Sequence, residues 1–138
     1  MTAELRPNLF PAVRYRDADA AVSFLKRAFG AQEKDVHRGE DGAIRHAELR
    51  IGVGIVMLGQ YAEEGWLGGE PPQPLASTIS IYAVIDDPDA HHGQAHEAGA
   101  RIVRELEDTP YGSREYSARD LEGNLWSFGT YDPYGAQR

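Results

Sequence analysis

The stretch that decides the fold runs from Tyr15 to Ala31 and reads YRDADAAVSFLKRAFGA. Asp17 or Asp19 can accept hydrogen bonds from the free N–H groups at a helix start, which predicts a helix over residues 20–29. Gly30 suits the left-handed position that ends a helix. One apolar stripe of this helix consists of Val22, Leu25, Ala28 and Phe29.

The residues on either side of this helix alternate between apolar and polar, as strands do. A strand is predicted before the helix, from Leu9 to Tyr15. Three strands are predicted after it, over residues 32–38, 44–51 and 55–58, separated by glycine-containing turns. The predicted order is therefore β-α-β-β-β.

The same order returns in the second half of the chain. Residues 61–77 are rich in glycine and proline and predict a linker. Beyond it we predict a strand over 78–85, a helix over 89–98 that ends at Gly99, and strands over 101–107, 114–119 and 124–131. The sequence thus divides into a first module at 1–60, the linker at 61–77 and a second module at 78–138, in one structural domain.

Residue numbering supports an internal repeat. Asp87 corresponds to Asp17 at an offset of 70 (87 minus 17), and Gly99 corresponds to Gly30 at an offset of 69 (99 minus 30). Arg114 with Arg45, and Gly123 with Gly54, also correspond at 69. One deletion in the second helix reconciles the two offsets, and the ordered matches favour a duplicated module.

Two segments resemble a known family. The strand–helix opening at Tyr15–Ala31 and the closing segment Asp120–Phe128, which reads DLEGNLWSF, are similar to those of the vicinal oxygen chelate superfamily of glyoxalases, bleomycin-resistance proteins and extradiol dioxygenases. The resemblance covers Asn8 to Asp132. It implies an α+β fold in which two βαβββ modules form a U-shaped, barrel-like mixed sheet with the helices outside and a cleft inside. It also implies a homodimer whose sites can be completed by the partner subunit.

In metal-using relatives, ligands enter the cleft from the first and last strands of each module. Counting from Asp17 and Asp87 places these positions at Phe10, Leu58, Ser80 and Ser127. None of these side chains offers the imidazole or carboxylate that divalent metals prefer, and a slip of one residue does not change this. We therefore expect no metal and no other cofactor, as in a metal-less glyoxalase-like branch.

Histidines on the second predicted helix offer a different metal cluster. His92 and His96 are four residues apart, which places them on one helix face at a spacing that two zinc ligands can use. Because the helix has few apolar residues, a solvated polar face is the favoured interpretation.

Strand alternation predicts which side chains line the cleft, because residues two apart share a face. The predicted ligand-binding residues are Phe10, Arg14, His46, Glu48, Arg50, Leu58, Trp66, Ser80, Tyr82, Glu115, Ser117, Arg119 and Ser127. The opposite face, expected to pack under the helices, carries Val13, Tyr15, Ile55, Met57, Ile79, Ile81, Trp126 and Phe128. A cleft that mixes aromatic, charged and hydroxyl side chains suits a small polar or aromatic organic ligand.

Some of these residues have two interpretations. His46 and Glu48 are candidate catalytic residues for general acid–base work, but cross-strand ion pairs in a wet groove are the favoured interpretation. Trp66 could cover the cleft as a lid or could pin the linker. Tyr111 and Arg114 flank a turn, and we expect them to stabilise it.

Composition excludes several classes of partner. The 138 residues carry a formal net charge of −8, which would repel a nucleic-acid backbone and favour a cationic ligand. No apolar run approaches the length that spans a bilayer, so we expect no membrane partner. The chain has no cysteine and can form no disulfide. We expect a cytoplasmic protein.

These features lead to three functional hypotheses. The leading one is a binding protein that holds a small organic molecule without a metal. Sequestration of an antibiotic is one form of this function. The alternative is a lyase, isomerase or dioxygenase of the same superfamily, either metal-dependent with a shifted ligand set or metal-free through His46 and Glu48. The third is a sensor or partner-binding subunit, because one fold hosts several unrelated functions.

Overall fold

The computed structural model describes residues 7–61 and 79–135. The first module consists of β1 (Ala12–Tyr15), α1 (Ala18–Phe29), β2 (Gln32–Arg38), β3 (Ile44–Ile51) and β4 (Gly54–Gln60). The second consists of β5 (Ile81–Val84), α2 (Pro88–Glu97), β6 (Arg101–Asp108), β7 (Arg114–Arg119) and β8 (Leu125–Gly129). The predicted β-α-β-β-β order is confirmed in both halves. Apart from Tyr61, the predicted linker lies outside the described residues.

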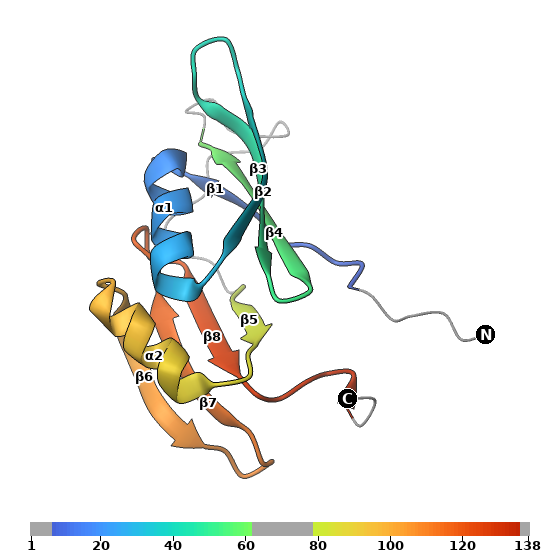
Figure 1. Cartoon of the computed structure of the whole chain (residues 1–138), viewed down its shortest axis with the longest axis vertical. Coiled ribbons are helices and arrows are strands. Elements are labelled where there is room, and N and C mark those ends of the chain that lie inside the picture. Colours follow the sequence, from blue (N-terminus) through green and yellow to red (C-terminus); the bar gives the residue numbers. More distant parts are fainter. Residues whose placement is uncertain (1–6, 62–78, 136–138) are drawn as a thin grey trace, which may run out of the picture.

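Each module forms a four-stranded mixed sheet. The strand order is β1-β4-β3-β2 in the first sheet and β5-β8-β7-β6 in the second. β1 runs parallel to β4, and β5 runs parallel to β8, whereas the other pairs are antiparallel. The α+β fold class is confirmed, but strand pairing leaves the described strands as two separate sheets instead of one closed, barrel-like sheet. In Figure 1 both helices lie on the left, with the first sheet to the right of α1 and with β6 of the second sheet behind α2.

The two helices begin in the same way. Asp17 and Asp87 have nearly identical backbone angles, and their side chains accept hydrogen bonds from the N–H groups of Ala20 and Ala90 at 3.0 and 3.1 Å. Such caps satisfy N–H groups that have no partner within the helix. Beyond its cap, α1 buries one broad apolar face, whereas α2 buries only Pro88 and Ala95.

One hydrophobic core serves both modules. α1 packs against α2, and the Phe29 ring at the end of α1 lies 5.3 Å from the Trp126 ring and 4.8 Å from the Phe128 ring of β8. Trp126 and Phe128 are fully buried. Aromatic rings from both halves therefore pack together in one core.

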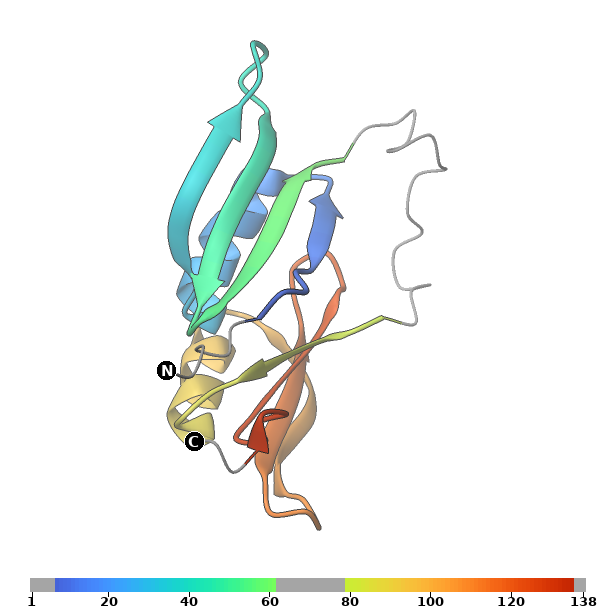
Figure 2. The same ribbon diagram turned by 90° about the vertical axis from the view of Figure 1, so that its right-hand side faces the viewer.

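A polar network also joins the modules. The carboxylate of Asp120, in the turn between β7 and β8, accepts hydrogen bonds from the Tyr15 hydroxyl and the Trp126 indole N–H. In the same turn, the Glu122 carboxylate accepts from the backbone N–H groups of Arg16 and Asp17 at 2.7 and 2.8 Å. The closing segment of the second module therefore holds the start of α1. Figure 2 shows this turn beside the first module, with the first sheet in front of α1.

Membrane-spanning character is not found in the described helices: none is both long enough and apolar enough to cross a bilayer.

Candidate functional site

The candidate site is the open face of each sheet, meaning the side turned away from the helices. Residues that pair directly across neighbouring strands share a face. The open face of the first sheet carries Ala12, Arg14, His46, Glu48, Arg50, Ile55, Met57 and Gly59. The open face of the second sheet carries Tyr82, Val84, Glu115, Ser117, Arg119, Leu125, Ser127 and Gly129.

The prediction that Leu58 faces the cleft is wrong. Leu58 pairs with Ala47 and Val13 and is only 2% exposed, so it packs under α1. The turn between β3 and β4 is one residue shorter than its counterpart. The corresponding pairs Arg50–Ile55 and Arg119–Leu125 enclose four and five residues, whereas a constant offset of 69 between the modules would require equal numbers.

A shift of one residue turns every side chain of a strand to the other face. Met57 and Ile55 consequently belong to the open face instead of packing under the helices as predicted. Val56 and Leu58 correspond to Trp126 and Phe128 at an offset of 70 (126 minus 56). Ile79, also predicted to pack under the helices, is 79% exposed.

On the first open face, His46 and Glu48 lie in one chain of contacts. His46 Nε2 is 2.9 Å from Glu48 Oε2, and Lys34 Nζ donates to Glu48 Oε1 at 2.9 Å. The hydrogen bond from His46 and then that from Lys34 lower the pKa of Glu48 to about 2. A carboxylate with this pKa stays ionised at neutral pH, where it is a poor general base and suits the orientation of His46.

Arg14 lies across the first sheet beside Gly59. Its guanidinium Nη1 donates to the backbone carbonyl of Arg45 at 3.4 Å. A side chain at position 59 would run into this guanidinium, so the glycine gives Arg14 its room. Burial lowers the pKa of Arg14 from its ordinary value.

On the second open face, Glu115 is the centre of a hydrogen-bonded group. Its side chain accepts from the Ser113 hydroxyl at 2.9 Å, the Tyr111 hydroxyl at 3.0 Å and the Arg104 guanidinium at 3.2 Å. Burial works to raise the pKa of Glu115, but the hydrogen bonds from Ser113, Tyr111 and Arg104 outweigh it and hold the pKa below its ordinary value. The residue is 4% exposed, and its charge is paired with Arg104.

Two serines continue this group toward the middle of the sheet. The hydroxyls of Ser117 and Ser127 are 2.7 Å apart, and Arg104 Nε donates to Ser117 at 3.1 Å. Either hydroxyl can be the donor, so the pair can present a donor or an acceptor to a ligand.

Three tyrosines border the same face at its end. The Tyr82 hydroxyl donates to the backbone carbonyl of Tyr131 at 2.9 Å, and the Tyr111 ring meets the Tyr131 ring edge-on at 5.7 Å. Burial and the nearby Glu115 charge raise the pKa of Tyr82 to about 12, so its hydroxyl stays protonated. Gly129 has no side chain, and Glu115 and Tyr82 occupy the space that a Cβ atom there would need.

The remaining predicted residues take less central places. Phe10 and Ser80 precede β1 and β5 and are exposed, and Arg50 is exposed at the end of β3. Arg119 donates to the carbonyl of Gly123 at 2.8 Å. Trp66 lies outside the described residues. The structure therefore brings His46 and Glu48 together on one sheet, and Tyr82, Glu115, Ser117 and Ser127 together on the other.

Sequence reasoning missed Arg104, Ser113 and Tyr131. Tyr111, expected only to stabilise a turn, also bonds to Glu115. Arg104 comes from β6, whose pairing with β7 contains irregular register shifts, so strand alternation alone could not direct it to Glu115. The one signal in the sequence that could have identified Arg104 was its charge, in a strand that otherwise alternates between apolar and polar residues.

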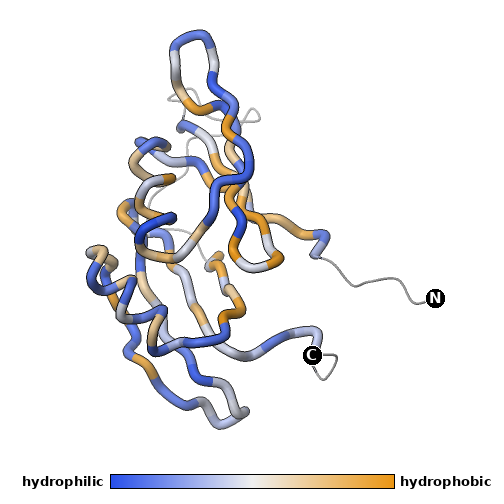
Figure 3. The backbone as a smooth tube through the Cα atoms, viewed as in Figure 1, coloured by the Kyte–Doolittle hydropathy of each residue, from blue (hydrophilic) through white to orange (hydrophobic). Residues whose placement is uncertain are grey.

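Several exposed apolar side chains lie before β1, before β5 and in the turn between β3 and β4. Leu9, Phe10, Val53 and Ile79 are 86%, 43%, 84% and 79% exposed. Figure 3 shows hydrophobic colouring along the segment before β1, at the β3–β4 turn and along β5. Large apolar side chains exposed in this way are candidates for contact with a ligand or another protein.

The superfamily's metal positions do not fit a divalent ion in this chain. With the corrected register, Met57 replaces Leu58 beside Phe10, Ser80 and Ser127, and none of the four provides an imidazole or carboxylate. Across residues 7–61 and 79–135, no three His, Asp or Glu side chains are arranged to hold a metal ion.

Comparison with known proteins identifies relatives over most of the chain. Uncharacterised proteins of Mycobacterium bovis and Mycobacterium tuberculosis are 34% identical over 132 residues, which cover 94% of this chain and 86% and 77% of theirs. The crystal structure of TioX from Micromonospora sp. ML1 is 35% identical and has a TM-score of 0.71, covering 89% of this chain and 94% of that one.

More distant structures share the fold. The hypothetical protein SA1046 from S. aureus is 17% identical, with a TM-score of 0.70 and coverage of 94% and 96%. The model of the Glyoxalase/Bleomycin resistance protein/Dioxygenase superfamily matches residues 9–128. The chain therefore belongs to the glyoxalase/bleomycin resistance protein/dioxygenase superfamily.

Proposed function

We propose that the protein binds a small organic molecule on the open face of the second sheet without a metal ion. The observation that carries this proposal is the grouping of Tyr82, Ser117 and Ser127 around the paired charge of Glu115 and Arg104. The tyrosine rings supply apolar contact area, and the serine hydroxyls supply adaptable hydrogen bonds. Because the charge of Glu115 is already paired with Arg104, the burial of this carboxylate does not oppose ligand binding.

Sequestration of an antibiotic is the form of this function that we favour. The family description that matches this chain includes bleomycin resistance proteins. The formal net charge of −8 would attract a cationic ligand over long range. Phe10, Met57, Ser80 and Ser127, which do not suit a metal ion, also favour binding over metal-dependent chemistry. We propose that the protein acts in the cytoplasm.

A homodimer is part of the proposal. The exposed side chains of Phe10, Val53 and Ile79 would be covered if a second copy packed against the open faces. The ligand would then lie between sheets of two subunits. Sedimentation analysis should give twice the 15.2 kDa mass of the chain. A monomer at working concentrations would remove this part of the proposal.

Isothermal titration of the metal-stripped, tag-free protein with metal-free bleomycin, a cationic glycopeptide, tests the binding function. We expect saturable binding, with the ligand recovered at unchanged mass. Ser127→Phe should block binding by filling the open face, whereas Ser23→Phe, on the exposed side of α1, should bind normally. Absence of binding to bleomycin and to planar aromatic drugs would reject the proposal.

A second function is favoured by one contact, the 2.9 Å approach of His46 Nε2 to Glu48. In a metal-free lyase or isomerase, His46 would transfer the proton and Glu48 would orient its ring. Conversion of a bound molecule, lost in His46→Ala, would support this function. Recovery of every tested ligand unchanged by the wild type would count against it.

A further inference from the structure

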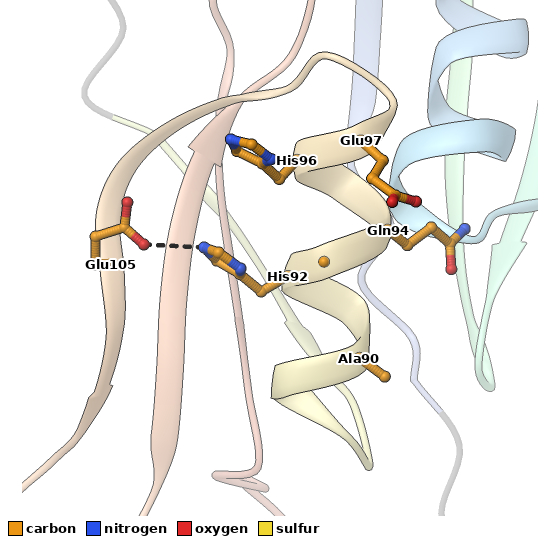
Figure 4. A pocket seen from close by; sticks show the side chains of 7 residues that line it. Ala90, His92, Gln94, His96, Glu97 and Glu105 are labelled. Carbon is orange, nitrogen blue, oxygen red and sulfur yellow. Dashed lines mark hydrogen bonds and ion pairs between the residues drawn. The ribbon is translucent and has the colours of Figure 1, made fainter.

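A separate group of polar side chains lies on the helix side of the second module, away from the open sheet faces. His92 and His96 project from one side of α2 toward β6, and Glu105 on β6 points back toward them (Figure 4). The three lie along a surface hollow of about 660 Å³. Its lining consists of Ala90, His92, Gly93, Gln94, His96, Glu97 and Glu105.

The two imidazole rings are arranged in parallel. Their centroids are 6.3 Å apart and their planes differ by 9°, as expected for residues one helical turn apart on one face. His92 Nε2 lies 2.9 Å from Glu105 Oε1. On its other side, the His92 ring meets the ring of buried Tyr116 edge-on at 5.1 Å, which fixes its place against the sheet.

His92 is less exposed than the two side chains beside it, His96 and Glu105. The side chain of His92 is 20% exposed, whereas that of Glu105 is 78% exposed. His96 is also exposed. A partly buried imidazole therefore stands beside an imidazole and a carboxylate that can both rotate toward it. As they stand, the three are not arranged round one point, and an ion would have to draw them together.

We propose that His92 and His96 bind one divalent transition-metal ion, with Glu105 as a third ligand or as the acceptor that orients His92. One ion can bridge two imidazoles that lie four residues apart on a helix. Water can complete the coordination of this ion. Imidazole nitrogen favours zinc, nickel and copper, and copper should bind most tightly. Magnesium and calcium, which prefer oxygen ligands, should not compete.

The helix offers little obstruction to such an ion. Gly93 lines the hollow beside His92, and no atom lies within 4 Å of where its Cβ would be. The site would connect α2 to β6 directly. This helix buries little apolar surface of its own, so a metal contact would hold it against the sheet.

The five histidines of the chain make the test selective. His37 and His46, which stack at 6.2 Å on the first module, provide a matched pair that is not on a helix. Metal-stripped, tag-free protein is titrated with zinc chloride and copper chloride by calorimetry, and the imidazole proton resonances are followed by NMR. We expect one ion per chain and shifts of the His92 and His96 resonances.

Substitution locates the site. His92→Ala and His96→Ala should each weaken zinc binding at least tenfold, and Glu105→Gln should weaken it less. The His37→Ala/His46→Ala double variant should bind zinc like the wild type. Since His96 is exposed, His96→Ala should fold normally, and circular dichroism checks this. Bleomycin binding should be unchanged in His96→Ala, which separates this proposal from the function of the open faces.

Two results would overturn the proposal. One is the absence of heat and of imidazole shifts with millimolar zinc and copper. The other is binding that persists in His92→Ala and His96→Ala but disappears in the His37→Ala/His46→Ala variant, which would place the ion on the first sheet.

Discussion

The hydroxyl of Tyr15 donates a 2.6 Å hydrogen bond to the carboxylate of Asp120, which lies 105 residues further along the chain. Both residues are buried, and this bond joins the end of β1 to the turn between β7 and β8. The same carboxylate accepts the Trp126 indole N–H at 3.1 Å and the backbone N–H groups of Glu122 and Asn124 at 3.0 Å. The aspartate of the closing motif therefore connects the two modules.

The first prediction concerns this aspartate. Asp120→Ala should lower the free energy of unfolding by about 3–5 kcal/mol, because buried donors on Tyr15 and Trp126 lose their acceptor. Tyr15→Phe, which removes one donor, should cost about 1.5–3 kcal/mol. Urea denaturation measures both, with the exposed Glu40→Ala as control. Equal stability of Asp120→Ala and the control would show that the network does not hold the modules together.

The second prediction concerns alkaline pH. Burial, followed by the charge of Asp120, raises the pKa of Tyr15 above its ordinary value of 10.0. The unfolded chain then loses this proton at lower pH than the folded chain. The stabilisation is fully present below pH 10 and decreases as pH rises above 10. Denaturation between pH 8 and 11 should show this loss, and Tyr15→Phe should reduce its slope. An unchanged slope would contradict this role of Tyr15.

The third prediction concerns acid. Burial lowers the pKa of His91, although the Phe29 carbonyl opposes the shift. His91 Nε2 lies 2.9 Å from that carbonyl, and Nδ1 lies 2.6 Å from the Tyr116 hydroxyl. The unfolded chain therefore binds the proton first, so stability is lost as pH falls below about 6.5.

NMR titration of the His91 ring can check this directly. Its midpoint should lie below 6.5 in the folded protein. A midpoint at or above 6.5 would contradict the assignment of His91 as a buried neutral ring.

The sequence predicted the ends of α1 correctly, but it did not predict the face of β4 or the group around Glu115. Gly30 and the cap at Asp17, one of two candidates, follow from local chemistry and lie where the sequence predicted them. The cap at Asp87 was indicated only by its correspondence to Asp17 in the repeat. The face of β4 did not follow. It depends on the number of residues in a turn, and the turn at Asp120 is longer than the turn at Gly52. The group around Glu115 needed Arg104 and Tyr131, which only the tertiary fold brings there.

The fourth prediction tests the corrected register of β4. Leu58→Ala should cost about 2–5 kcal/mol, because its side chain packs in the shared core and leaves a cavity. Met57→Ala, one residue earlier on the open face, should cost less. Thermal or urea denaturation of the two variants compares them under one condition. A larger loss of stability in Met57→Ala would instead support the orientation of β4 that was predicted from the sequence.

The fifth prediction uses two glycines as a matched pair. Gly129→Ala should destabilise the fold by about 1–3 kcal/mol and weaken ligand binding, because its Cβ would displace Glu115 and Tyr82. Gly93→Ala meets no neighbouring atom and lies inside α2, so it should stabilise by about 0.5–1 kcal/mol. If both substitutions had the same effect, the packing of Glu115 over Gly129 would be refuted.

The central claim is that a ligand lies on the open face of the second sheet, and amide NMR spectra of the metal-free protein titrated with bleomycin test it most directly. We predict saturable shifts at Tyr82, Ser117 and Ser127, with Ala95 and His96 of α2 unaffected. Shifts confined to α2, or no shifts with millimolar bleomycin and planar aromatic drugs, would contradict the claim.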